Sequence, residues 1–466
     1  MYLAIACPAS TTVQPRSLWR CVTAPVAAGL LLMMVALAPV HAGGRAPAET
    51  RQAMPGDSVA PGPAEGIPVL SQDRLLGAFI ATTRLEAGTE FDSNPFGRRT
   101  NVVSDRIDSV APGLTIASRW ARHSLTIDLG VDHRMYDKAG FNATDLTGRM
   151  SGIINIARGL DVGADIERRR QSSLNSPSTA NPQNLLGTTN QPISPVDLFG
   201  NRDIPGNVAS PVPTTQGLER VWARYNGPRI TNTVSATWQN SEFGSVQTDI
   251  GATVQLGSLS SEQLRLENRT EVRLSHRLRT VVAVSETTRE FPTLSARNST
   301  TRAIDNAWEL MLTPLVSTNL ILAIAQEKFD ANSFDPSNSK SATVGLNYQP
   351  RRYLALGAAA TAGEAGVNFE QDSSSSKFWG ISSSLKYDIT RRLALQGGAS
   401  YLHADREALR SGPRTDDNYS WNLGLTYNFW RDATIGLQHG QRLTKSSDTP
   451  NDLDQQTTRL QLRARF

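Results

Sequence analysis

The sequence predicts an all-β fold, an antiparallel, up-and-down transmembrane β-barrel of about 18 strands, in a range of about 16 to 20. Three observations indicate this fold. Apolar and polar residues alternate through most of the chain, short polar segments interrupt the alternation at regular distances, and the alternation continues to the last residue, Phe466.

The alternation has a period of two residues. In the segment Ser420–Phe429, every second residue from Trp421 onward is large and apolar, and the residues between are small or polar. Successive side chains of a strand point to opposite faces of a sheet, so the segment predicts one apolar and one polar face. Residues 125–131, 379–387 and 393–401 repeat the pattern, and helical spacing fits none of them as well.

Short polar segments separate the predicted strands near residues 121, 158, 228, 277, 315, 350, 390 and 430. Most neighbours among them are about 35 to 40 residues apart, which accommodates two strands of about ten residues and one longer loop. A propeller blade of similar length would hold four strands, and an open sheet in a soluble domain seldom exceeds about ten strands. A closed membrane barrel fits, because it satisfies every backbone hydrogen bond within hydrocarbon.

The segment Thr457–Phe466 places leucine, alanine and phenylalanine on one face and arginine and glutamine on the other. We expect it to be the closing strand, hydrogen-bonded to the first strand, with Phe466 facing lipid. A terminal aromatic residue on such a strand resembles the signal that the barrel assembly machinery recognises. This machinery and outer-membrane lipid are therefore expected partners.

Three regions are expected along the chain. Residues 1–42 predict a signal peptide, because Arg16 and Arg20 precede a short apolar core that is followed by small residues. Residues 43–75 are rich in Pro, Gly and Ala and predict a flexible periplasmic lead-in. Residues 76–466 are expected to form the outer-membrane barrel.

The composition of the mature chain excludes several classes of site. Cys7 and Cys21, the two cysteines, lie in the predicted signal peptide, so thiolate metal sites and cysteine nucleophiles are excluded. The signal peptide also holds two arginines and no acidic residue, and its removal lowers the formal net charge from +4 to +2. Such a weak balance indicates no nucleic-acid partner.

The segment Thr82–Tyr136 carries a set of motifs: R-L-E-A-G-T-E-F-D-S-N-P-F from Arg84, S-D from Ser104, V-A-P-G-L-T from Val110 and W-A-R-H-S-L-T from Trp120. It resembles the opening of the second putative β-barrel porin family, outer-membrane proteins of Gram-negative bacteria often associated with exopolysaccharide loci. The strand rhythm extends this resemblance over about 390 residues. The resemblance implies a bacterial outer-membrane location and a porin-like barrel, and it brings no catalytic residues.

Charged residues at alternate positions are expected to face the lumen, because an arginine on the lipid face near the midplane costs about 2 to 4 kcal/mol. The segment Leu264–Leu274 shows this most clearly, with five charges alternating with other residues. The predicted lumen-facing charges are Asp128, Asp132, Arg134, Asp161, Asp165, Glu167, Arg265, Glu267, Arg269, Glu271, Arg273, Arg459, Arg463 and Arg465. Opposed acidic and basic groups across the lumen would bias which solutes pass. Alternatively, these charges pair across strands and only line a water-filled wall.

The segment 171–217 is rich in Pro, Asn, Ser and Thr and nearly uncharged. It predicts a long extracellular loop between the fifth and sixth strands. Long loops without secondary structure are usually functional or disordered. Two alternatives are therefore open: the loop folds into the lumen as a constriction, or it is a mobile surface loop.

The predicted function is that of a porin-like outer-membrane channel for polar or saccharide material, linked to exopolysaccharide export, with polysaccharide export components as partners. The histidines are scattered, and no metalloprotease, nucleophile-elbow or phosphate-binding motif occurs in the right context. We therefore expect no enzyme activity, no catalytic residue, no metal site and no cofactor. Two alternatives are a non-conducting structural component of a polysaccharide secretion machine and a barrel enzyme acting on lipid or glycan.

Overall fold

A computed structural model describes residues 74–95, 102–173, 212–247, 253–331, 336–367, 373–408, 412–447 and 452–466. The predicted signal peptide and nearly all of the predicted lead-in lie outside these residues. Within the described part of the chain, no helix has the length and hydropathy needed to cross a membrane.

One antiparallel sheet contains nearly all of the described secondary structure. Its barrel strands are β2 (Phe79–Asp92), β3 (Asp105–Ser118), β4 (His123–Tyr136), β5 (Asn142–Ala157), β6 (Leu160–Ser173), β7 (Val212–Asn226), β8 (Ile230–Phe243), β11 (Ser261–Arg273), β12 (Leu278–Glu290), β13 (Ser299–Thr313), β14 (Val316–Phe329), β15 (Ser337–Arg351), β16 (Leu354–Ala365), β17 (Ser373–Asp388), β18 (Leu393–Ala408), β19 (Arg414–Trp430), β20 (Ala433–Ser446) and β21 (Leu453–Arg465). The sheet has 19 strands in total because the short β1 (Arg74–Leu76) pairs with the start of β2, which leaves 18 strands in the barrel.

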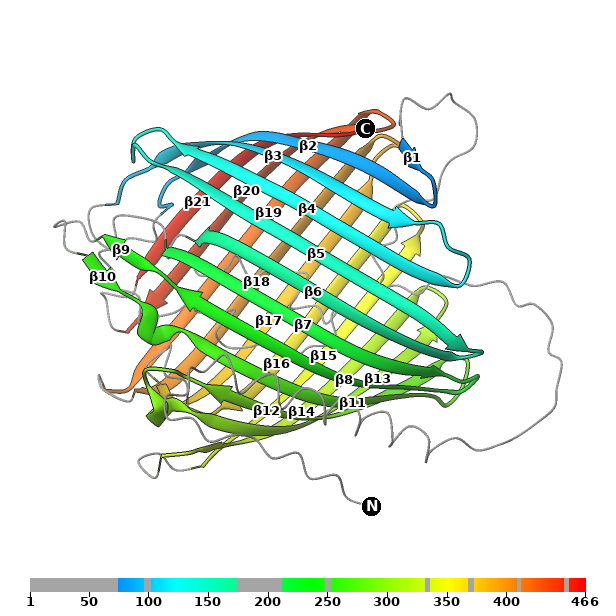
Figure 1. Cartoon of the computed structure of the whole chain (residues 1–466). Helices are drawn as coiled ribbons and strands as arrows, with labels where there is room; N and C mark the ends of the chain where they lie inside the picture. Colours follow the sequence, from blue (N-terminus) through cyan, green and yellow to red (C-terminus); the bar gives the residue numbers. More distant parts are fainter. Residues whose placement is uncertain are drawn as a thin grey trace, which may run out of the picture. The chain divides into compact units, whose positions relative to one another are not determined.

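The barrel closes between its first and last strands (Figure 1). β2 and β21 pair in an antiparallel register that runs from Arg84 opposite Arg465 to Asp92 opposite Thr457. The backbone of Phe466 continues the pairing, because its N–H donates to the Thr83 carbonyl at 2.8 Å and its carbonyl accepts the Thr83 N–H at 2.9 Å. The predicted 18-strand closed barrel, with Thr457–Phe466 as its closing segment, is therefore confirmed.

The two ends of the barrel differ in the length of their connections. The short connections link β3 to β4, β5 to β6 and each later pair at that end, and they coincide with the predicted polar segments. One of the two-residue connections holds Arg158 and Gly159, and Gly159 has a φ of 81°, a conformation that favours glycine. The opposite end carries longer connections, including the hairpin β9 (Ser245–Gln247) and β10 (Thr253–Gln255) and the 3₁₀ turns η2 (Gly257–Leu259) and η3 (Ser295–Arg297).

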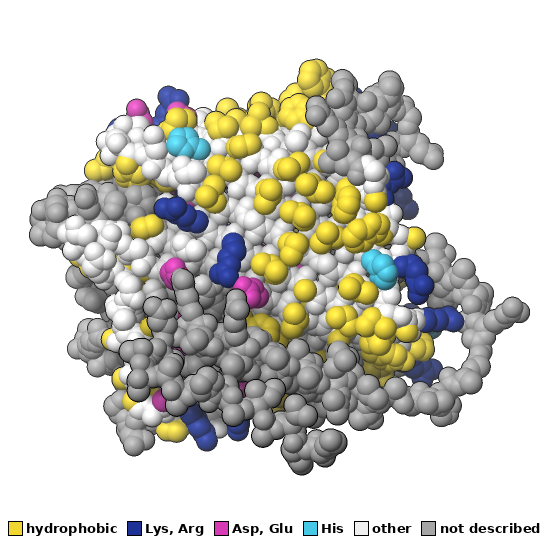
Figure 2. Space-filling model, viewed as in Figure 1, with side chains coloured by type: hydrophobic (Ala, Val, Ile, Leu, Met, Phe, Trp, Pro, Cys, Tyr) yellow, Lys and Arg dark blue, Asp and Glu magenta, His cyan; other side chains and the backbone are white. Residues whose placement is uncertain are grey.

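The alternation of the sequence divides the barrel wall into two faces. On β13 and β14, the neighbouring residues Ile304 and Ile324 are 56% and 66% exposed, although both are large and apolar. Large, exposed apolar side chains recur at alternate residues along the barrel strands. Figure 2 shows hydrophobic side chains spread over the outer face of the barrel. Exposed apolar bands of this extent mark a surface that contacts lipid or protein.

The predicted loop 171–217 needs correction at both ends. β6 extends to Ser173 and β7 begins at Val212, and the register pairs these two residues with each other. The polar composition of these flanks misled the prediction, because strand residues beyond an apolar band can be polar without ending the ladder. The remaining segment, 174–211, joins the fifth and sixth barrel strands as expected and lies outside the described residues.

Candidate functional site

The interior face of the barrel is the candidate site, because it gathers the charges that the sequence singled out. The registers place every residue of the predicted set on the face opposite the exposed apolar side chains. On β11, for example, Arg265 lies between Thr237 of β8 and Thr287 of β12, whereas the adjacent Leu266 belongs to the exposed apolar face.

The seam between the first and last strands carries one interior cluster. Glu86 on β2 accepts hydrogen bonds from Arg463 on β21 at 2.9 Å and lies 3.5 Å from Arg459. Arg465 lies opposite Arg84 in the register, and the Arg84 side chain covers Gly113 of β3. The two strands that close the ring are therefore joined by charge-assisted hydrogen bonds as well as by their backbone ladder.

A second cluster lies on β4 and β5. Arg134 forms an ion pair with Asp145 on the next strand, lies 3.7 Å from Asp132, and donates to the carbonyl of Ser172 on β6 at 3.1 Å. Asp128, farther along β4, accepts a hydrogen bond from the Thr115 hydroxyl at 2.6 Å. One arginine therefore connects three adjacent strands.

A third cluster combines carboxylates with an aromatic side chain on β6 and β7. Asp165 accepts hydrogen bonds from the Ser151 hydroxyl at 2.6 Å and from the Trp222 indole N–H at 3.1 Å. The indole covers Gly163, whose lack of a side chain makes room for it, and the Arg224 guanidinium lies 4.8 Å from the indole ring. Elsewhere on β6, Asp161 accepts from Asn226, and Glu167 pairs with Arg169 at 2.8 Å.

The fourth cluster occupies β11 to β13. Arg265 pairs with Glu267 on the same strand at 2.7 Å, and Arg279 on β12 bridges Glu271 at 3.1 Å and Glu309 on β13. Arg269 makes no hydrogen bond or ion pair with other described residues. Arg273 lies opposite Arg279 at the end of the ladder, beside the pair that Arg279 forms.

The charged clusters occupy only part of the interior wall. In the ring of 18 strands, β15 to β17 lie nine strands away from β4 to β6, and so face them across the lumen. The interior positions in the middle of β15 to β17 are uncharged, and all but Phe378, whose ring lies beside Gly363, are small. The small ones are Ser339, Ser341, Thr343, Gly345, Gly357, Ala359, Thr361, Gly363, Gly380, Ser382 and Ser384. Thr343 and Thr361 share a hydrogen bond of 2.9 Å on this wall.

The structure shows how the lumen charges are arranged relative to one another. Most acidic and basic groups pair with one another on the same wall, at 2.7 to 3.1 Å in the clearest cases, rather than opposing each other across the lumen. The uncharged wall and Trp222 were not predicted from the sequence. The serines that recur at every second position from Ser337, followed by glycine and alanine on the next strand, were the available signal.

The histidine with the most polar contacts lies on the exterior face. His403 on β18 is 2.8 Å from Asp417 and 3.4 Å from Asp405, with the Trp379 ring 5.8 Å away. The described residues place no serine or cysteine in hydrogen-bond contact with this imidazole. Among them, no three His, Cys, Asp or Glu side chains are grouped in a way that could hold a metal ion.

Comparisons with known proteins give matches to one family model and to solved structures. The family model described as "Putative beta-barrel porin 2" matches residues 73–466. Among solved structures, OccK5 (OpdH) of Pseudomonas aeruginosa is 11% identical with a TM-score of 0.47, over 83% of this chain and 98% of that one. The outer membrane protein OpdK of the same organism is 10% identical with a TM-score of 0.46, with the same two coverages. The search of curated proteins gave no match.

Proposed function

Since the chain belongs to the "Putative beta-barrel porin 2" family of bacterial outer-membrane barrels, we propose that it is a passive channel for polar, largely uncharged solutes of the saccharide class. One observation carries this proposal. A wall of hydrogen-bonding, mutually paired charges on β4 to β6 faces a wall of small hydroxyl-bearing and glycine residues on β15 to β17.

Sugar hydroxyls both donate and accept hydrogen bonds, so they can exchange with a wall that offers carboxylates and guanidinium groups side by side. A free ion gains little from the paired groups of such a wall, because each of them already has a partner of opposite sign. The small residues on the facing wall leave room, since glycine and alanine project almost nothing into the lumen. Pore linings of this kind select by size and hydrogen bonding.

Trp222 adds a specific contact for sugars. Its indole is fixed by the hydrogen bond to Asp165 and by the space above Gly163. An aromatic ring carries partial negative charge on its face and attracts the C–H groups of a sugar ring. We propose that Trp222 slows saccharides on their way through the lumen, and that the natural cargo is material of exopolysaccharide production or export.

Planar-bilayer conductance of the purified barrel tests the proposal. We expect steady open steps, and we expect neutral oligosaccharides to interrupt the current. Trp222→Ala should shorten these interruptions several-fold. Trp238→Ala is the matched control, because Trp238 lies on the exterior face of the neighbouring strand β8. A purified, folded barrel that never conducts would refute the channel and support a non-conducting structural role. Equal effects of the two substitutions would refute the role of Trp222.

A further inference from the structure

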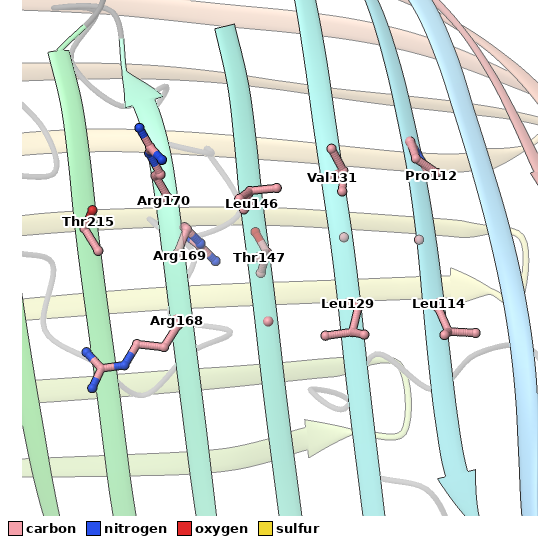
Figure 3. Close-up of a pocket in the computed structure, with 13 residues that line it drawn as sticks. Pro112, Leu114, Leu129, Val131, Leu146, Thr147, Arg168, Arg169, Arg170 and Thr215 are labelled. Carbon is pink, nitrogen blue, oxygen red and sulfur yellow. The ribbon is translucent and has the colours of Figure 1, made fainter.

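A groove of about 640 Å³ lies on the barrel wall across β3 to β6, and it is lined mainly by apolar atoms of the exterior face (Figure 3). Its apolar side chains are Leu114 on β3, Leu129 and Val131 on β4, and Leu146 on β5. Gly148 provides the hollow between them. A Cβ atom added there would meet only Leu129, at 3.7 Å, so the space above this glycine is open.

The groove ends beside two exposed arginines of β6. The register places Arg168 next to Gly148 and Arg170 next to Leu146. Arg168 donates to Asn240 at 2.9 Å and to Glu219 at 2.8 Å, and Figure 3 shows its side chain directed toward the strand of Thr215, away from the leucines. Arg170 makes no hydrogen bond or ion pair with other described residues.

These arginines lie where the exterior face changes from apolar to polar. On β6, Arg168 follows Ile166, the last apolar exterior residue before the strand reaches its longer connection. On β7, the equivalent change occurs between Val221 and Glu219. In outer-membrane barrels the end with longer loops faces the cell exterior. The groove therefore lies in the outer leaflet, with its arginines at the level of the lipid headgroups.

An arginine at this level that pairs with no other described residue favours an anion, and the groove beside it favours an apolar chain. We propose that this site binds one phosphorylated glycolipid of the outer leaflet, of the lipopolysaccharide class. An acyl chain occupies the groove above Gly148, and a phosphate of the glycolipid accepts hydrogen bonds from Arg170. Arg168 keeps its hydrogen bonds to Glu219 and Asn240. Its guanidinium adds positive electrostatic potential near the phosphate without a change of side-chain position.

Native mass spectrometry of the full-length barrel, mixed with bisphosphorylated lipid A in detergent, tests the site. We expect one lipid A molecule to remain bound. Arg170→Gln should weaken binding roughly five-fold, the value for one arginine at an anionic lipid surface. Gly148→Leu should weaken it at least as much, because the new side chain fills the groove. Phosphatidylglycerol should bind more weakly than lipid A, since it offers one phosphate and two chains.

Arg302→Gln is the matched control. Arg302 is an exterior arginine near the same end of β13, and it pairs with Glu286 at 2.8 Å, far along the ring from the groove. Its substitution should leave lipid A binding unchanged. Equal losses for Arg170→Gln and Arg302→Gln would overturn the proposal in favour of general surface attraction, as would unchanged binding in Gly148→Leu. Heat-modifiable mobility in gels confirms that each variant is folded. Lipid A binding is measured without reference to conductance, so this test is independent of the proposed channel function.

Discussion

Two neighbouring residues of β19 give the most direct test of which face meets lipid. Leu425 is 39% exposed on the exterior face, and Gly424 lies on the interior face. Tyr419 and Phe429 mark the aromatic borders of the apolar stretch on this strand. At a rise of about 3.4 Å per residue and a tilt of about 40°, these borders are roughly 26 Å apart along the membrane normal. Leu425 is therefore close to the midplane.

An arginine at these two positions should have opposite consequences. Leu425→Arg places a guanidinium in hydrocarbon and should cost about 2 to 4 kcal/mol, which lowers the folding equilibrium constant roughly 30- to 700-fold. Gly424→Arg directs the same group into the lumen. A Cβ atom added at Gly424 meets its nearest neighbour, the Leu437 carbonyl oxygen, at 3.8 Å, so the backbone need not shift. We expect this variant to lose less than about 1 kcal/mol.

Equilibrium unfolding from phospholipid vesicles in guanidinium chloride, followed by tryptophan fluorescence, measures both free energies. Each variant is compared with the wild-type barrel at the same lipid-to-protein ratio. The assignment of faces is wrong if Gly424→Arg destabilises the barrel as much as Leu425→Arg does. It is also wrong if both substitutions are neutral, because then neither residue contacts hydrocarbon.

Three further substitutions test the interior and the seam. Glu86→Gln should leave Arg459 and Arg463 without their shared carboxylate, and the reversal potential in a salt gradient should shift toward anions, whereas Gln461→Asn, which changes no charge, should not shift it. Phe466→Ala should reduce the amount of assembled barrel in outer-membrane fractions, whereas Phe466→Trp should preserve it. Both variants keep the backbone bonds to Thr83, so they differ only in the aromatic ring. Equal amounts of assembled barrel would contradict an aromatic assembly signal. Gly163→Val should lower the free energy of unfolding by about 1 to 3 kcal/mol, because its Cβ meets the Gly152 carbonyl oxygen at 2.9 Å and the Trp222 ring, whereas Gly424→Val should not.

The architecture could be predicted because each of its determinants is local in the sequence. The alternation in Ser420–Phe429 sets the two faces of β19 without reference to any other strand. The short connections lie close to the polar segments, so the count of 18 strands followed from spacing alone. The closing role of Thr457–Phe466 followed from the same reasoning, because a barrel in lipid must pair its last strand with its first.

The contacts of the interior could not be predicted, because they depend on register. Glu86 and Arg463 are 377 residues apart in sequence and meet only because β2 and β21 pair with one particular stagger. The position of Trp222 over Gly163 depends in the same way on how β6 aligns with β7. A shift of one residue would send either side chain to the lipid face. Sequence spacing thus identifies which residues face inward, but not which residues they meet.

The pairing of interior charges has a consequence for what the lumen can select. Potentials of isolated charges extend about 8 Å at physiological ionic strength, but an acid and a base that are about 3 Å apart, as Arg279 and Glu271 are, cancel most of each other's field at that distance. Where its charges are paired, the interior therefore presents many hydrogen-bonding groups with little long-range potential. Such a wall would distinguish solutes by their hydroxyl groups and size more than by their charge, which is the physical basis for proposing a neutral polar solute as the cargo.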